Sequence, residues 1–300
     1  MTRVQANLVL LLSAAIWGGG FVAQATAMDR IGPFWFVGLR FAIAAAAVLP
    51  FALMEQKRIG RAPTSAEMTG FALVGCALFA GAITQQIGLM TTSVTNSSFL
   101  TGLYVVFVPV LSILVFRKAP HWIIWPVALL SLFGIFLLAG ASVSSLSTGD
   151  FWSILCAVFW AMQILLAGHF VSRSSRPLAL SATQFAVCAV LAMAGGLLLE
   201  PLSLESVRAS LVEILYVGLI SSGLAFVLQV VGQRYTTAPQ AAIFLSSEAL
   251  FGAFFGAVLL GESLPATGYV GCGLIFMAML LVELVPEILK RRNNSRRMRA

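Results

Sequence analysis

Residues 6–28 read ANLVLLLSAAIWGGGFVAQATAM, and this stretch decides the class of fold. It contains no charged side chain, and it exceeds the roughly 20 apolar residues that a helix needs to cross a bilayer core. The segment 150–171, DFWSILCAVFWAMQILLAGHFV, has the same character apart from an aspartate at its start and a histidine near its end. Because lipid cannot hydrogen-bond to a bare backbone, both segments are predicted to be transmembrane helices.

Stretches of this kind recur along the whole chain. The ten predicted spans are 6–28, 34–54, 68–89, 95–116, 121–140, 150–171, 178–199, 211–231, 240–260 and 266–285. Of the 300 residues 60% are hydrophobic and only 10% are charged, whereas a soluble domain carries about 25% charged residues. The sequence therefore predicts an all-α polytopic membrane protein.

Lysine and arginine placement predicts the orientation. With a cytoplasmic N-terminus, only Arg30 and Arg208 of the 18 basic residues lie outside, and Arg40 lies within a span. The positive-inside rule thus predicts cytoplasmic N- and C-termini in a bacterial inner (plasma) membrane. The basic tail 290–300 is expected to contact anionic lipid, since no nucleic-acid-binding module accompanies it.

Residues that carry enzyme chemistry are scarce. The four cysteines lie inside apolar stretches without disulfide or metal-ligand spacing, and the two histidines are far apart. The chain also lacks a phosphate-binding loop and the common hydrolase motifs. We therefore predict neither catalysis, nor a cofactor, nor a metal.

The two halves of the chain are related by a repeat. An offset of 143–144 positions places Trp17 on Trp160 and Gln85 on Gln229. The predicted units are residues 1–145 and 146–289, followed by the tail 290–300. Five spans per unit is an odd number, so the second unit enters the bilayer from the opposite side. Such inverted repeats commonly enclose a binding site at their interface near the midplane and work by alternating access.

Three motifs carry a resemblance to a known family. They are WGGGFV at 17–22, NSSFLTGLY at 96–104 with Val108-Pro109, and SEALF at 247–251 leading to Gly261-Glu262. Together they resemble the EamA branch of the drug/metabolite transporter superfamily, which includes the YddG-type amino acid exporters. The resemblance implies two five-helix repeats and export of metabolites such as amino acids. Arg117-Lys118 departs from the pattern, because it stands where a Gly-Glu pair is expected in the first half.

Two charged residues lie deep within predicted spans, Arg40 and Glu248. Each costs about 2.5–3.5 kcal/mol on insertion scales, so each needs a partner or water. Glu248 is a candidate for binding a substrate ammonium, for carrying a coupling proton, or for pairing with Arg40. Arg40 is a candidate for clamping a carboxylate, or for the structural half of that pair.

Uncharged polar and aromatic side chains form stripes at helical spacing. Such stripes are expected to face the bundle interior, where they either line a path or join helices by hydrogen bonds. Trp17 and Trp160 fall in mid-span, away from the interfacial belts that hold most membrane tryptophans. The predicted substrate-binding residues are Trp17, Arg40, Gln85, Ser97, Thr101, Tyr104, Trp160, Gln163, Gln184, Gln229 and Glu248.

The sequence thus predicts a secondary carrier or exporter of small organic metabolites, most simply amino acids. A phosphate-sugar or nucleotide-sugar exchanger and a non-transporting membrane enzyme or assembly protein are the alternatives. The expected partners are a metabolite and membrane lipid, with no nucleic acid. Because G-x-x-x-G at Gly252 and Gly256 suits close helix contact, the chain is expected to be a monomer or a homodimer.

Overall fold

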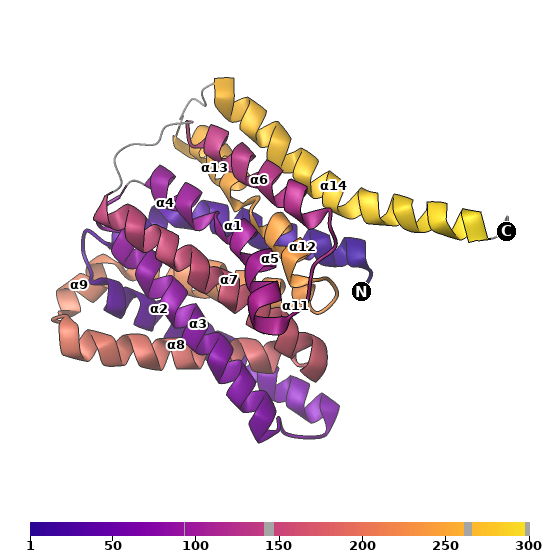
Figure 1. The fold of residues 1–300 in the computed structure, drawn as a ribbon. Coiled ribbons are helices and arrows are strands. Elements are labelled where there is room, and N and C mark those ends of the chain that lie inside the picture. Colours follow the sequence, from indigo (N-terminus) through magenta and orange to yellow (C-terminus); the bar gives the residue numbers. More distant parts are fainter. Residues whose placement is uncertain (93, 141–146, 261–265, 298–300) are drawn as a thin grey trace.

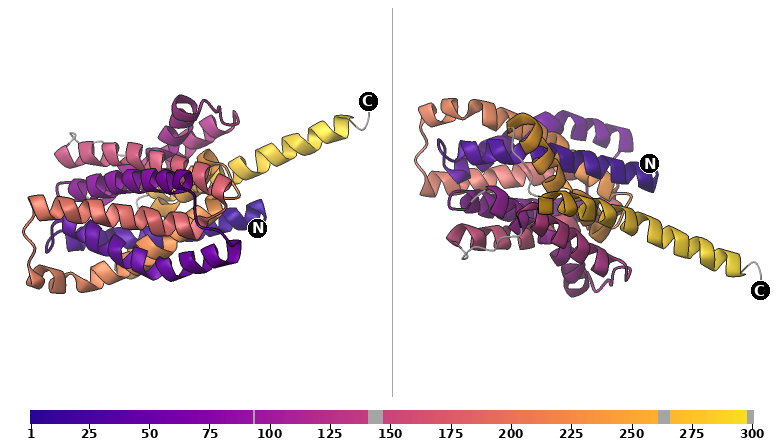
Figure 2. Two further views of the ribbon diagram at one scale, coloured as in Figure 1. Left: turned by 90° about the horizontal axis from the view of Figure 1, so that it is seen from below. Right: turned by 90° about the horizontal axis from the view of Figure 1, so that it is seen from above.

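The computed structural model describes residues 1–92, 94–140, 147–260 and 266–297. The predicted Gly261-Glu262 pair and the predicted boundary at 145/146 lie outside these ranges. Long helices run side by side as one bundle, and both chain ends lie at the same end of it (Figures 1 and 2). No strand occurs in the described part of the chain.

The helices follow one another with short connections. In chain order they are α1 (Arg3–Ala27), α2 (Pro33–Ile59), α3 (Ser65–Leu89), α4 (Val94–Thr101), α5 (Tyr104–Phe116), α6 (Ile124–Leu138), α7 (Thr148–Ser174), α8 (Pro177–Leu199), α9 (Leu204–Ala209), α10 (Leu211–Tyr216), the π-helix η1 (Val217–Leu224), α11 (Ala225–Gln233), α12 (Ala238–Leu245), α13 (Glu248–Leu260) and α14 (Ala266–Arg297).

All ten predicted spans coincide with helical stretches of the described residues. Nine are long and apolar enough to cross a membrane, and α6 is a shorter apolar helix. The prediction of a span over 121–140 was too long, since residues 121–123 form the turn before α6. The last predicted span, 266–285, matches the apolar stretch Ala266–Pro286 of α14, and the helix itself continues to Arg297. Hydropathy indicates where charged residues begin, whereas a helix can continue beyond that point. The all-α polytopic fold is confirmed.

Local sequence explains where the helices begin. Thr2, Thr64 and Ser147 accept a hydrogen bond from the backbone of the residue three places on, and a returning side chain closes each capping box. Pro33 and Pro177 occupy the first turn of α2 and α8, where a missing N–H costs nothing.

Three of the spans are interrupted in mid-membrane. The fourth span breaks at Gly102-Leu103, and α5 begins at Tyr104. The ninth breaks at Ser246-Ser247, whose hydroxyls donate to the carbonyls of Ile243 (2.8 Å) and Phe244 (2.6 Å). Hydroxyls that compete for helix carbonyls bend a helix, and glycine weakens one. The eighth span contains η1.

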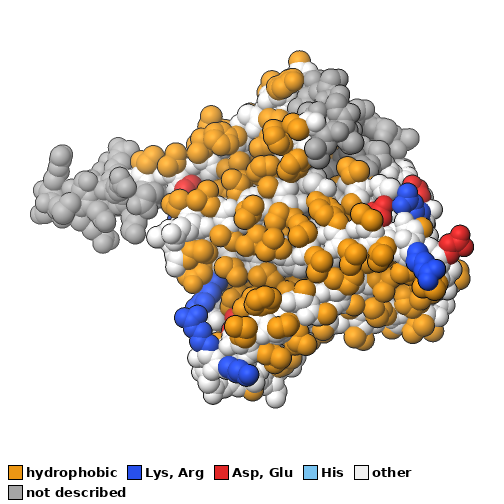
Figure 3. Space-filling model, turned by 180° about the vertical axis from the view of Figure 1, so that it is seen from behind, with side chains coloured by type: hydrophobic (Ala, Val, Ile, Leu, Met, Phe, Trp, Pro, Cys, Tyr) orange, Lys and Arg blue, Asp and Glu red, His pale blue; other side chains and the backbone are white. Residues whose placement is uncertain are grey.

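The outer surface of the bundle is suited to lipid. Figure 3 shows hydrophobic side chains over most of one face, with charged side chains gathered toward its two ends. Leu198 is 84% exposed and Leu197 is 74% exposed. Large leucines can be exposed to this degree where the solvent is a bilayer, so this surface supports a membrane-spanning protein.

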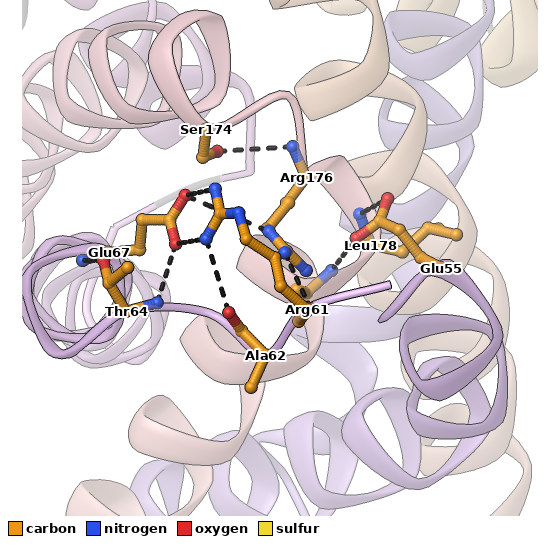
Figure 4. Close-up of polar contacts among 9 residues, drawn as sticks. Glu55, Arg61, Ala62, Thr64, Glu67, Ser174, Arg176 and Leu178 are labelled. Carbon is orange, nitrogen blue, oxygen red and sulfur yellow. Dashed lines mark hydrogen bonds and ion pairs between the residues drawn. The ribbon is translucent and has the colours of Figure 1, made fainter. Parts of the chain in front are cut away.

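Pairs of helices from different halves pack against each other: α2 on α8, α3 on α7, and α6 on α14. At one end of the bundle a group of charged residues joins the α2–α3 loop to the α7–α8 loop (Figure 4). The fully buried Arg176 donates to the carbonyl of Arg61 (2.8 Å), and its Nε lies 3.9 Å from Glu67. The hydrogen bonds that Arg61 donates to the Glu67 carboxylate raise the pKa of Arg61 above its ordinary value.

Two substitutions in this group should have unequal effects on stability. Glu67→Gln leaves the buried guanidinium of Arg176 without a nearby carboxylate, which should lower the free energy of unfolding by about 1–3 kcal/mol. Arg176→Met removes the buried charge, while Glu67 still accepts hydrogen bonds from Arg61 (2.8 and 2.9 Å). It should therefore leave the free energy of unfolding nearly unchanged. Thermal unfolding in detergent measures both. A larger loss for Arg176→Met than for Glu67→Gln would contradict this account.

Candidate functional site

A cavity lies between the two halves, near the middle of the helices that form it. Its volume is about 50 Å³, which is room for a few waters. Its lining comprises Trp17, Phe21, Gln24, Arg40, Gln85, Thr101, Tyr104, Trp160, Gln163, Ile164, Ser221, Ser222, Phe226, Gln229 and Glu248. Nine of the eleven predicted site residues are among them.

Arg40 provides the positive charge of this cavity. It is buried in α2, and its Nη1 donates to Oε1 of Gln24 at 2.6 Å. Its guanidinium carbon lies 5.0 Å from the ring centre of Phe41 and 5.3 Å from that of Phe36, within cation–π range. Its Nε has no hydrogen-bond partner among the residues that the structure describes, so a donor remains for a solute.

Glu248 provides the acidic group of this cavity. It is the first residue of α13, directly after the helix break, and it is buried. The hydroxyl of Tyr104 interacts with its carboxylate, although their geometry falls short of a hydrogen bond. The predicted repeat offset pairs Tyr104 with Glu248, and both lie immediately after a break. Among the described residues no ion pair joins Arg40 to Glu248, so the structure does not contain the direct structural pair that was one interpretation.

Three glutamines from α11, α7 and α8 form a buried chain. Nε2 of Gln229 donates to Oε1 of Gln163 (2.9 Å), and Nε2 of Gln163 donates to Oε1 of Gln184 (3.1 Å). Gln184 lies behind the lining and orients Gln163, which faces the cavity. Oε1 of Gln229 has no hydrogen-bond partner in the described part of the chain. This chain therefore presents an unused acceptor to an occupant.

An aromatic wall completes the cavity. Phe226 lies between the two predicted tryptophans, 4.7 Å from Trp17 and 5.6 Å from Trp160 by ring centres. The indoles therefore do not form an uninterrupted pair. Nε1 of Trp17 donates to the carbonyl of Ser221 (2.9 Å), which belongs to η1, where the π-helical pattern changes the normal hydrogen bonding. Nε1 of Trp160 has no hydrogen-bond partner within the described ranges.

Ser97 and Gln184 are the two predicted residues outside the lining. Ser97 accepts a hydrogen bond from Ser153 at 3.1 Å, so the structure gives it a helix-joining contact. Gln85 and Thr101 do line the cavity, and they lie 3.5 Å apart by their side-chain polar atoms.

Six lining residues were absent from the predicted set: Phe21, Gln24, Ile164, Ser221, Ser222 and Phe226. Helical spacing indicates three of them, since Gln24 shares a face with Trp17, and Ser222 and Phe226 share a face with Gln229. Ser221 lies in η1, where a period of 3.6 residues no longer indicates which side chains share a face.

A second, larger cavity of about 530 Å³ lies at the end of the bundle that holds the N-terminus. Its walls come from both halves and include Lys118, His121, His169 and Arg173. Lys118 follows Arg117, which ends α5 in a left-handed conformation (φ 51°). The unusual Arg117-Lys118 pair thus places a positive charge at a vestibule between the halves.

Comparison with known proteins identifies the kind of protein that this fold and cavity belong to. The model of the EamA-like transporter family matches residues 4–140 and again residues 147–284. The chain belongs to the EamA-like transporter family. It is therefore a multi-pass membrane transporter of the drug/metabolite transporter superfamily.

Relatives of this EamA-like transporter agree with that assignment. An uncharacterized transporter of Archaeoglobus fulgidus is 32% identical over 282 residues, which cover 94% of this chain and 87% of that protein. A solved crystal structure superposes with a TM-score of 0.78, covering 96% of this chain and 99% of that one, at 18% identity. At that identity the likeness concerns the fold alone.

Proposed function

We propose that this EamA-like transporter carries small zwitterionic metabolites, most simply amino acids, out of the cell across a bacterial inner membrane. The N- and C-termini are cytoplasmic in this proposal, and transport occurs by alternating access. One observation carries the proposal: Arg40 and Glu248 line the same cavity without forming an ion pair with each other.

The chemistry of the lining suits an amino acid. A guanidinium with an unused Nε can bind a carboxylate through charge-assisted hydrogen bonds. The carboxylate of Glu248 can accept from an ammonium, and the wall of Trp17, Trp160 and Phe226 can pack against an apolar side chain. The cavity pairs one positive with one negative residue, which favours a solute that is itself neutral overall.

The size of the cavity supports alternating access. Space for a few waters is less than an amino acid occupies, so helices that line the cavity must move apart before a solute can bind. Two inverted repeats around a central site provide such a motion without new structure. The 530 Å³ vestibule supports access from the end that carries the termini.

A phosphorylated sugar suits this cavity less well. A phosphate carries up to two negative charges, and phosphate sites gather several arginine or lysine donors. Arg40 is the one arginine of this lining, and Glu248 lies in the same cavity. That carboxylate would repel a phosphate.

A flux screen in proteoliposomes tests the function. We expect zwitterionic amino acids to move at least about tenfold faster than their N-acetyl or carboxamide analogues, because each lost charged hydrogen bond costs about 1.5–3 kcal/mol. Equal flux of the N-acetyl or carboxamide analogues, each of which lacks one of the two charged groups, or a preference for sugar phosphates, would contradict the proposal. Repeating the screen with an imposed proton gradient tests coupling: flux that ignores the gradient removes Glu248 from that role.

A further inference from the structure

Helices α2 and α8 contact each other at both ends of the pair. They come from different halves and pack against each other along their lengths. Each begins with a proline, Pro33 or Pro177, and each carries a glutamate at or near its far end, Glu55 or Glu200. These two glutamates are not part of the cavity lining.

Each glutamate caps the start of the other helix. The two oxygens of Glu55 accept from the backbone N–H groups of Leu178 (3.1 Å) and Ala179 (2.9 Å). The two oxygens of Glu200 accept from the N–H groups of Phe34 (3.0 Å) and Trp35 (3.1 Å). The two contacts therefore repeat one arrangement at opposite ends of the same helix pair.

The physical chemistry explains why carboxylates stand at these positions. A carboxylate near the C-terminus of its own helix is disfavoured by the helix dipole. Here it lies at the N-terminus of the neighbouring helix, where the dipole favours it and free N–H groups need acceptors. Since the leading prolines donate nothing, the N–H groups of the next two residues are the ones bound.

Packing between the caps prevents the helices from sliding. A methyl group on Gly38 of α2 would lie 2.8 Å from Cγ of Met193 in α8. Gly195 and Gly196 of α8 face the rings of Phe34 and Trp35, at 2.4 Å and 3.0 Å from an added methyl. A shift of one helix turn, about 5.4 Å, would drive side chains into these glycines and break both caps.

We propose that Glu55 and Glu200 are positioning residues that hold α2 and α8 in one register throughout transport. The α2–α8 pair is then a stationary element shared by both halves, and the other helices move around it. This register fixes the positions of Arg40, on α2, and of Gln184, on α8, which orients Gln163. The consequence for transport rests on the proposed function, whereas the caps themselves do not.

Amide hydrogen exchange tests the caps directly, because the effect must appear on the opposite helix. Glu55→Ala should speed exchange about tenfold at the start of α8, and Glu200→Ala should do the same at the start of α2. Glu55→Gln and Glu200→Gln keep one acceptor and should restore part of the protection. Glu205→Ala removes an exposed carboxylate of α9 near Glu200 and should change neither region. Unchanged exchange at the opposite helix would overturn the proposal.

The same measurement separates a stationary pair from alternating latches. With a saturating mixture of neutral amino acids, protection at both helix starts should stay constant. Exchange that rises at one start and falls at the other would show that the caps open in turn, and would overturn the stationary pair.

Transport rates test the positioning role. Flux should fall about fivefold or more in the Glu55→Ala/Glu200→Ala double variant, with a higher KM, because Arg40 loses its fixed position. Wild-type flux in a double variant that has lost both protections would overturn this role. If the wild-type protein moves no solute, the proposed function fails while the cross-helix exchange pattern still decides the caps.

Discussion

Replacing Arg40 by glutamine is expected to raise the KM for a zwitterionic solute about 10- to 100-fold while leaving the protein as stable as before, or more stable. A charged hydrogen bond to a carboxylate contributes about 1.5–3 kcal/mol to binding. In the structure Arg40 is buried beside Gln24 and two phenylalanine rings, with no carboxylate partner among the described residues. A buried charge of this kind costs folding free energy, so its removal should not lower the unfolding temperature.

The matched control is Arg30→Gln, which removes a half-exposed arginine paired with Glu213 (3.2 Å). It should leave KM unchanged, because Arg30 is not part of the cavity lining. It should also change stability little, since an exposed pair contributes at most about 1 kcal/mol. Both variants are compared by zero-trans flux and by thermal unfolding. The carboxylate-binding role of Arg40 is wrong if Arg40→Gln loses stability and flux together, or if it handles a zwitterion and its carboxamide as the wild type does.

The second large effect is expected at Gly18, where α1 crosses α13. A methyl group there would lie 2.6 Å from the backbone N of Gly252 and 2.7 Å from the carbonyl oxygen of Glu248. Backbone atoms cannot rotate away as a side chain can, so α1 and α13 must separate. Gly18→Ala should lower the free energy of unfolding by about 1–3 kcal/mol and reduce flux at least tenfold, because Glu248 moves with its helix.

The neighbouring glycine supplies the control. A methyl group on Gly19 would meet only the hydroxyl of Tyr216 at 3.4 Å and the ring of Phe255 at 3.6 Å. Gly19→Ala should therefore be neutral, or should stabilise α1 by up to about 1 kcal/mol. Stability and flux are measured for both in the same membrane mimetic. Equal effects of the two substitutions would show that the α1–α13 crossing is not the reason for the glycine at 18.

The membrane spans follow directly from the sequence, because a bilayer imposes one strong requirement on every segment that crosses it. The run around Trp17 and its counterpart around Trp160 suffice to predict α1, α7 and their relationship. The mid-span positions of Arg40, Glu248 and the two tryptophans also mark the cavity, since polar groups avoid lipid. This reasoning works residue by residue and needs no knowledge of helix packing.

Packing decides the remainder, and it could not be predicted from spacing. Nothing in the hydropathy of residues 211–231 indicates the π-helical stretch that carries Ser221 and Ser222. Helix neighbours decide whether Arg40 forms an ion pair with Glu248. They also decide that Phe226 lies between the two tryptophans. The reciprocal caps at Glu55 and Glu200 were missed for the same reason, because each joins residues more than 120 positions apart.

The small volume of the central cavity has a bioenergetic consequence. Because the central cavity has room for only a few waters, a carrier resting in this conformation is expected to hold no continuous file of water through that cavity. Under the proposed alternating access, the membrane is then expected to stay sealed to protons and sodium ions while the carrier rests. Turnover is expected to be limited by how often the helices part, on the microsecond-to-millisecond timescale of such motions, and not by diffusion through a pore.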